Sequence, residues 1–247
     1  TVTDFNGCTS TTSTTITEPP QINASLSSLT SVACNGNSTG SAGITVSGGT
    51  PSGGGSPYQY LWNTGGTGSS ISGRPAGTYT VTVTDAISCT ATVTAIITEP
   101  AQPLTTGAAS STNINCFGNN NGTASVSPSG GTIPYQYTWN TSPTQSTSNI
   151  SSLPLGTYTV TVSDNNSCTA TTSVTITQPA LLTSTITASS NVTCFNGGNG
   201  SATVAASGGT AAYTYLWNSA PAQTGTTANN LIPGNYVVTV TDGNSCT

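Results

Sequence analysis

The chain has 247 residues and carries six acidic side chains, one basic side chain, and no histidine or methionine, which gives a net charge of −5. One arginine cannot supply the basic surface that binds nucleic acid phosphates or anionic membranes. Nucleic acid binding is therefore excluded. Membrane insertion is excluded as well, because no apolar run approaches the roughly 20 residues of a membrane-spanning helix.

Three motifs recur along the chain at steps of 77 to 82 residues. They are SGGT, which ends at Thr50, Thr132 and Thr210; a strand of the form YxYxWN around Trp62, Trp139 and Trp217; and a longer strand that ends at Asp85, Asp164 and Asp242, with a partial copy ending at Asp4. A period of this length predicts one small domain per repeat. We assign residues 1–20 to the C-terminal tail of a preceding repeat, 21–100 to repeat 1, 101–179 to repeat 2 and 180–247 to a truncated repeat 3. The chain is therefore expected to be a window from a longer array.

Each repeat consists of short alternating runs separated by glycine, proline and asparagine, and none has the period of a helix. Tyr135, Tyr137 and Trp139 occupy every second position, so their rings lie on one face of a strand. The proline and glycine before Tyr158 and before Tyr236 resemble the tyrosine corner of immunoglobulin-like sandwiches. We predict an all-β fold of tandem small immunoglobulin-like (PKD-like) β-sandwich domains, about 80 residues per repeat. The predicted core aromatic residues are Trp62, Trp139, Trp217, Tyr79, Tyr158 and Tyr236.

The seven cysteines stand at repeat-locked positions, two in each full repeat. Such a framework predicts disulfides formed in an oxidising compartment, and hence secretion. A zinc site is disfavoured because the chain has no CxxC motif and no histidine.

Three pairings of these cysteines are open. We favour bonds across the short gaps, Cys8 with Cys34, Cys89 with Cys116 and Cys168 with Cys194, which leave Cys246 unpaired. Cys168 and Cys194 flank two strand-like runs with QPALL at their midpoint, as the ends of a hairpin would. A bond within one repeat would have to span most of a strand, beyond the 7 Å limit between Cα atoms. Bonds that skip from one domain to another are the third arrangement.

Catalytic chemistry has few candidates in this chain. Asp4, Asp85, Asp164 and Asp242 occupy one equivalent position, where an aspartate caps the backbone of a hairpin turn. Calcium needs six to eight oxygens, more than one such turn supplies unless a neighbouring repeat contributes. Serines and cysteines have no histidine or lysine to activate them. We therefore predict that the protein is not an enzyme and binds no metal or cofactor.

The string from CFGNNNGTASVSPSGGT through YQYTWN to LGTYTVTVSDNNSCTATTSVTITQP resembles the SprB repeat. This repeat is found in very large cell-surface adhesins of gliding Bacteroidota and related filamentous bacteria. The resemblance implies export by the type IX secretion system, an extracellular filament at the cell surface, and attachment to surfaces, polysaccharide or other cells.

We accordingly expect a structural repeat segment of a giant secreted adhesin, in which neighbouring repeats form a disulfide-stapled stalk. Two alternatives remain open. The chain could be a subunit of a homo-oligomeric extracellular fibre used for gliding or for capturing other cells. It could also be a carbohydrate-binding array, in which exposed tryptophan and tyrosine rings stack on sugars and avidity adds to weak sites.

Overall fold

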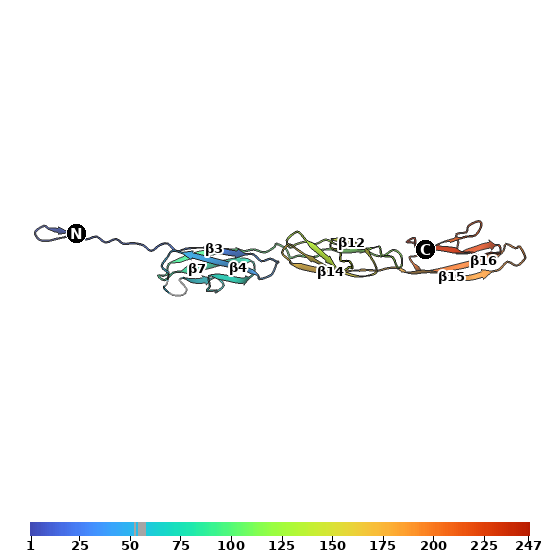
Figure 1. Ribbon diagram of the computed structural model, residues 1–247, viewed down its shortest axis with the longest axis horizontal. Coiled ribbons are helices and arrows are strands. Elements are labelled where there is room, and N and C mark those ends of the chain that lie inside the picture. Colours follow the sequence, from blue (N-terminus) through green and yellow to red (C-terminus); the bar gives the residue numbers. More distant parts are fainter. Residues whose placement is uncertain (52, 54–57) are drawn as a thin grey trace. The chain divides into compact units, whose positions relative to one another are not determined.

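The computed structural model describes residues 1–51, 53 and 58–247, and every regular element among them is a β-strand. Two compact units are present, Thr1–Pro103 and Leu104–Thr247 (Figure 1). Within the described residues no helix is long and apolar enough to cross a membrane.

The first unit begins with a small exposed hairpin of β1 (Val2–Thr3) and β2 (Thr9–Ser10). A sandwich of two antiparallel three-stranded sheets follows. One sheet has the order β3 (Asn23–Thr30), β4 (Gly40–Ser47), β6 (Ser70–Arg74), and the other β5 (Gln59–Trp62), β7 (Gly77–Thr84), β8 (Thr90–Ile97).

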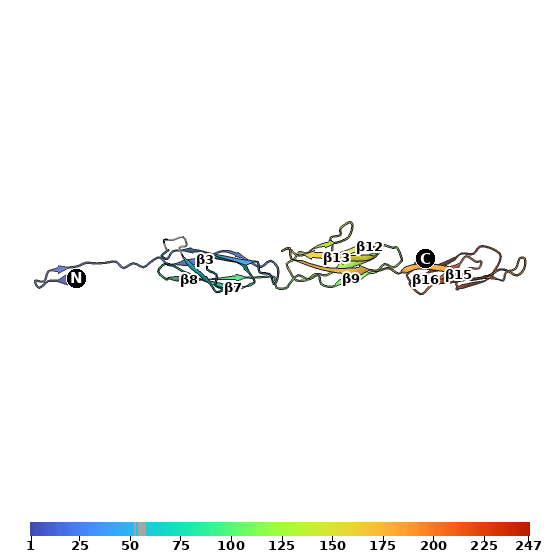
Figure 2. The same ribbon diagram turned by 90° about the horizontal axis from the view of Figure 1, so that it is seen from below.

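The second unit contains two further sandwiches (Figure 2). Each consists of two sheets that lie face to face. In the second sandwich the sheets are β12 (Asn149–Leu153), β10 (Gly122–Val126), β9 (Ala109–Thr112) and β11 (Gln136–Trp139), β13 (Gly156–Ser163), β14 (Thr169–Ile176). In the third sandwich they are β15 (Ala180–Ser190), β16 (Gly200–Gly209), β18 (Thr227–Leu231) and the pair β17 (Thr214–Trp217), β19 (Val238–Thr241).

Alternating residues along the central strands build the core of each sandwich. On β13, Val160 and Val162 are fully buried, while Thr159 and Thr161 alternate with them on the outer face, opposite Ser173 and Thr171 of β14. The pairing runs without interruption from Gly156 opposite Ile176 to Ser163 opposite Thr169. This period of two gives one apolar face and one polar face, as in a sheet that is covered on one side only.

The aromatic residues close the core. Trp62, Trp139 and Trp217 are each 1% exposed, and their indole N–H groups donate to backbone carbonyls at 2.9 Å. The hydroxyls of Tyr79 and Tyr158 donate to the carbonyls of Pro75 and Pro154, four residues upstream, which is the geometry of a tyrosine corner. The prediction of tandem immunoglobulin-like sandwiches is therefore confirmed. Because the indoles are buried, they cannot form the sugar-stacking platform that an exposed stripe would offer.

Candidate functional site: the disulfide junction of the second and third sandwiches

One aspartate organises the cysteine hairpin of the third sandwich. The Asp242 Oδ1 atom accepts hydrogen bonds from the backbone N–H groups of Asn244 and Cys246, both at 2.9 Å. The backbone of Asp242 also donates to the carbonyl of Cys246. The carboxylate thus holds the cysteine backbone in a fixed place. Asp4, Asp85 and Asp164 make the same pair of bonds in their own hairpins.

The other carboxylate oxygen reaches a loop that is distant in sequence. Asp242 Oδ2 accepts from the backbone N–H of Thr210 at 2.8 Å, and Thr210 is the last residue of the SGGT motif. The preceding Gly209 has φ +57, and a Cβ there would stand 2.6 Å from Asp242 Oδ2, so only glycine fits. Asp85 and Asp164 bind Thr50 and Thr132 in the same way. Sequence reasoning missed this contact, although the recurrence of SGGT in step with the aspartate was a signal for it.

These hydrogen bonds lower the pKa of the three sandwich aspartates from the ordinary value of 3.8. For Asp85 the largest cause is the N–H group of Thr50. For Asp164 and Asp242, burial acts to raise the pKa, and three backbone N–H groups together outweigh it. All three carboxylates are therefore ionised at neutral pH, which is the state that accepts these bonds.

We expect acid to weaken the hairpins. Because the folded pKa of Asp164 lies below its unfolded value, the carboxylate contributes stability above pH 3.8, and this contribution is lost as the pH falls further. Asp164→Asn should therefore lower the free energy of unfolding at pH 7, and the difference from the native chain should shrink below pH 3.8. Urea unfolding of the native chain and of Asp164→Asn, monitored by circular dichroism at pH 7, 5 and 3, measures this difference in the free energy of unfolding and its dependence on pH. A difference that stays constant over this range would contradict the role given to the charge.

The second half of the junction is the turn that precedes β10. The backbone of Ile114 donates to the Thr177 carbonyl at 3.0 Å, and the side chain of Asn113 accepts from the Thr177 N–H at 2.9 Å. The N–H of Gly118 donates to Gln178 Oε1 at 3.0 Å. These bonds attach the turn to Thr177 and Gln178, which belong to the linker between β14 and β15. The linker to the next sandwich therefore fixes the position of the turn.

A disulfide joins the two halves. Cys116 of the turn is bonded to Cys246 of the hairpin, with a Cα–Cα distance of 5.7 Å and a sequence separation of 130. The side-chain amide of Asn244 donates to the Asn115 carbonyl at 2.9 Å and to the hydroxyl of Thr210 at 3.0 Å. The bond therefore connects the second sandwich to the third, and a hydrogen bond accompanies it.

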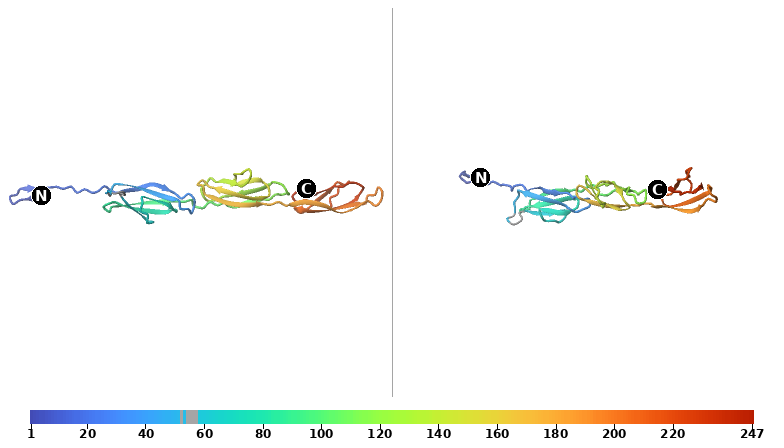
Figure 3. Two further views of the ribbon diagram at one scale, coloured as in Figure 1. Left: turned by 60° about the horizontal axis from the view of Figure 1, so that its bottom comes forward. Right: turned by 45° about the vertical axis from the view of Figure 1, so that its right-hand side comes forward.

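The pairing of cysteines across the short gaps is wrong. Cys8, Cys89 and Cys194 are exposed free thiols, so none of the bonds Cys8–Cys34, Cys89–Cys116 and Cys168–Cys194 forms, and Cys246 is not unpaired. The reason is that QPALL is no hairpin. β14 ends at Ile176, and β15 begins at Ala180 within QPALL; the two strands belong to different sheets, and the chain runs on from one into the other (Figure 3). The bond from one sandwich to another, the third arrangement, is the one observed for Cys116.

The junction has few groups for chemistry beyond this bond. Among the described residues no group of three or more histidine, cysteine, aspartate or glutamate side chains is placed to hold a metal ion. A cavity of about 350 Å³ lies beside the disulfide, lined by Phe117, Leu181 and Leu182 together with the hairpin. The arrangement is suited to linking domains, because the polar side chains of the junction are hydrogen-bonded to backbone groups.

Comparison with protein families identifies the repeat. The SprB repeat matches three segments of the chain, residues 26–67, 108–144 and 186–222. The search of curated proteins gives no match.

Several solved structures match the chain at low sequence identity. The three N-terminal domains of the highly immunogenic outer capsid protein of bacteriophage RB49 are 14% identical, over 89% of this chain and 85% of that one, with a TM-score of 0.36. A C-terminal fragment of intimin, in complex with the intimin-binding domain of its translocated receptor, is 17% identical over 68% and 67%, with a TM-score of 0.35. A tetra-tandem repeat from the extending region of a large adhesion protein is 16% identical over 92% and 64%, with a TM-score of 0.24. These values are too low to support a functional comparison.

Proposed function

Because the chain carries three SprB repeats, we propose that it is a structural segment of a giant secreted cell-surface adhesin, in which the repeats form a disulfide-stapled stalk. The stalk would be exported by the type IX secretion system and would hold other regions of the protein away from the cell, where they attach to surfaces, polysaccharide or other cells. On this proposal the segment carries tension and performs no catalysis.

The observation that carries the proposal is the bond between Cys116 and Cys246. A disulfide within one sandwich would stabilise that sandwich alone, whereas this one links two consecutive sandwiches. It also closes a loop of 130 residues, so that the covalent path through this part of the chain is short even when the sandwiches unfold. An extracellular segment that is pulled at its ends benefits from such a bond, because unfolding then releases little length.

The composition agrees with an extracellular stalk. The chain has no lysine, and its one basic residue, Arg74, precedes a proline, which leaves trypsin-like proteases almost no site to cleave. It also has no methionine, a common target of oxidation. Both features favour long survival outside the cell.

Single-molecule force spectroscopy tests the stalk role. We expect the oxidised chain, pulled at its two ends, to reach a maximal extension shorter than that of the reduced chain. The 130 residues between the two cysteines account for at least about 400 Å of this difference, at roughly 3.3 Å per extended residue. Equal maximal extensions of the oxidised and reduced chains would show that no disulfide keeps these 130 residues from extending, and would overturn the proposal. Binding of the intact chain to a panel of glycans would instead favour the carbohydrate-binding alternative.

A further inference from the structure

A pocket on the second sandwich is formed by the loop between β11 and β12, the end of β12 and Tyr158. This loop pocket has a volume of about 540 Å³. A groove of about 480 Å³ is lined by residues of β9, β10 and β12, and Ser151 lines both the groove and the loop pocket. Both volumes lie in the range of about 300 to 1,000 Å³ that is typical of ligand sites. The two hollows adjoin at Ser151, so together they can hold an extended ligand.

Hydrogen bonds from side chains hold the loop wall of this pocket in place. The carboxamide of Gln145 donates to the Ser151 carbonyl at 3.3 Å and accepts from the Ser151 N–H at 3.4 Å. The backbone N–H of Gln145 donates to Thr141 Oγ1 at 2.9 Å. Asn140, where the loop begins, accepts from the N–H of Thr159 at 2.9 Å. The loop pocket is therefore preformed, and a ligand would lose little free energy in ordering it.

A bulge in β12 keeps a side chain where glycine would be less strained. The pairing of β10 with β12 shifts between Gly122 and Ala124, and Ser152 in this bulge has φ +60. The equivalent residue of the first sandwich is Gly73, with φ +62. Residues other than glycine are strained in this conformation, and such strain is frequent at binding sites. Ser152 lines the loop pocket, so the strain retains a hydroxyl group there.

The loop pocket offers hydroxyl groups and apolar surface. The hydroxyls of Ser142, Ser151 and Ser152 form no hydrogen bond with the described residues. A hydroxyl group can both donate and accept, as the hydroxyl groups of a sugar do. Pro143 and Tyr158 line the same pocket and supply its apolar part. This combination suits a molecule that has hydroxyl groups along its edges and C–H groups on its faces.

The unit that contains the loop pocket has no exposed charged side chain. In residues 104–247 the charged side chains are Asp164 and Asp242, which are 4% and 5% exposed and accept hydrogen bonds from the backbone. A charged ligand would lose hydration here without gaining an opposite charge. The site therefore favours a neutral ligand.

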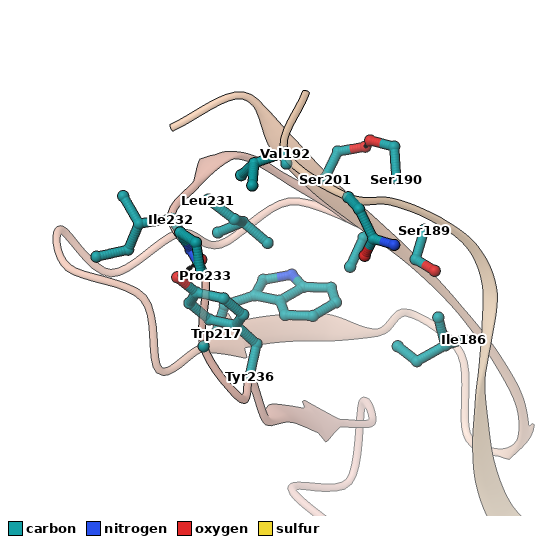
Figure 4. A pocket seen from close by; sticks show the side chains of 14 residues that line it. Ile186, Ser189, Ser190, Val192, Ser201, Trp217, Leu231, Ile232, Pro233 and Tyr236 are labelled. Carbon is teal, nitrogen blue, oxygen red and sulfur yellow. Dashed lines mark hydrogen bonds between the residues drawn. The ribbon is translucent and has the colours of Figure 1, made fainter. Parts of the chain in front are cut away.

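The third sandwich has the same pocket. Its cavity, of about 390 Å³, lies at the loop between β17 and β18. The carboxamide of Gln223 exchanges two hydrogen bonds of 2.9 Å with the backbone of Asn229, and Asn230 has φ +55. Figure 4 shows Tyr236, which lines this cavity, beside the buried ring of Trp217. Loop, bulge and tyrosine thus recur together in two sandwiches.

The first sandwich differs at the same positions. Gly66 takes the place of Gln145, since the carbonyl of each accepts from the N–H of the core tryptophan before it. Gly73 takes the place of Ser152, and the loop between β5 and β6 is shorter than its counterpart. Because the carboxamide and the hydroxyl are absent there, we expect no equivalent site on the first sandwich.

We propose that the loop pocket and the adjoining groove of the second sandwich bind a neutral polysaccharide, and that the third sandwich binds it at the equivalent cavity. The serine hydroxyls would pair with sugar hydroxyls, and the C–H face of one sugar ring would lie on the proline and the tyrosine. This mode does not need the tryptophan rings, which are buried.

The inference goes beyond the stalk role, because a stalk with such sites would also bind along its length. The force measurement depends on the disulfide alone. Each of the two proposals can therefore fail without the other.

NMR titration of the intact oxidised chain tests the proposal. The probes are short neutral oligosaccharides of dextran, mannan and β-1,3-glucan, with a short polygalacturonate as the charged comparison. We expect a neutral probe to cause saturable shifts of the amides of Gln145 and Ser151, and of Gln223 and Asn229. The charged probe should leave these amides unchanged, and no probe should shift the amides of β6.

Ser151→Leu should lower the affinity of the second sandwich at least about tenfold, because the larger side chain fills both hollows and clashes with the ligand. The shifts at Gln223 should persist. Ser146→Leu is the matched control, since Ser146 is an exposed residue of the same loop that does not line the pocket. It should bind like the native chain.

Ser152→Gly separates binding from folding. It should weaken binding about three- to tenfold through the loss of one hydrogen bond. It should also raise the urea midpoint of the Leu104–Thr247 unit, because glycine relieves the strain at φ +60.

Four results would overturn the proposal. One is the failure of every neutral probe to shift these amides, and another is an equal effect of Ser151→Leu and Ser146→Leu. The third is saturable shifts of similar size on the first sandwich, which would mean that binding does not use the loop pocket. The last is a change of the same amides with protein concentration in the absence of sugar, which would mean that a second copy of the chain fills the pocket.

Discussion

Trp139→Ala is expected to unfold the second sandwich or bring it close to unfolding. Trp139 is 1% exposed, is among the largest fully buried side chains, and donates its indole N–H to the Thr147 carbonyl. Replacing a buried tryptophan by alanine costs about 3 to 5 kcal/mol, from lost burial and from the cavity that remains. A small domain has only about 5 to 15 kcal/mol of stability in total.

Hydrogen exchange locates the effect. The buried residues around Trp139 belong to a cluster that shares no member with the cluster around Trp62. We therefore expect amides of β10 and β13 to lose protection in Trp139→Ala, while those of β4 and β7 keep theirs. Trp139→Phe keeps a ring in the core and should cost less. Loss of protection throughout the chain would show that the sandwiches do not fold separately, and unchanged protection of β13 would contradict the core role of Trp139.

The strands of each sandwich could be predicted because the information for them is local. Alternation of Tyr158, Val160 and Val162 with threonine fixes which face of β13 is buried, whatever the rest of the chain does. The proline before each corner tyrosine likewise acts within a few residues. The same reasoning identified the aspartate of each hairpin, whose bonds reach only two and four residues along the chain.

Contacts between distant segments could not be predicted in this way. Spacing alone makes Cys168 and Cys194 look like the two ends of a hairpin, because a run of strand, linker and strand does not reveal whether the chain turns back. Here β14 ends one sandwich and β15 begins the next. The bond from Asp164 to Thr132 is similar, since its partners are 32 residues apart and meet only after both sheets have formed.

Cys116→Ser should destabilise the Leu104–Thr247 unit more than any other single change at the junction. The bond to Cys246 closes a loop of 130 residues, and the entropy of closing such a loop in the unfolded chain corresponds to about 5 kcal/mol. The variant also leaves the Asn244 contact to Asn115 as the main polar tie between hairpin and turn. We expect the urea midpoint of the oxidised unit to fall accordingly, and the difference from the native chain to vanish once both proteins are reduced.

Cys194→Ser provides the control for this prediction, because Cys194 occupies the equivalent turn of the third sandwich and is an exposed free thiol. Its loss should change the free energy of unfolding by less than about 0.5 kcal/mol, as for other surface substitutions. Peptic digestion of the native chain without reductant should release Cys116 and Cys246 in one linked pair of peptides. If Cys194→Ser instead destabilises the chain as much as Cys116→Ser, or if Cys194 is recovered linked to Cys168, the short-gap pairing is correct. The bond between Cys168 and Cys194 would then join the second and third sandwiches, and Cys116 and Cys246 would not be bonded to each other.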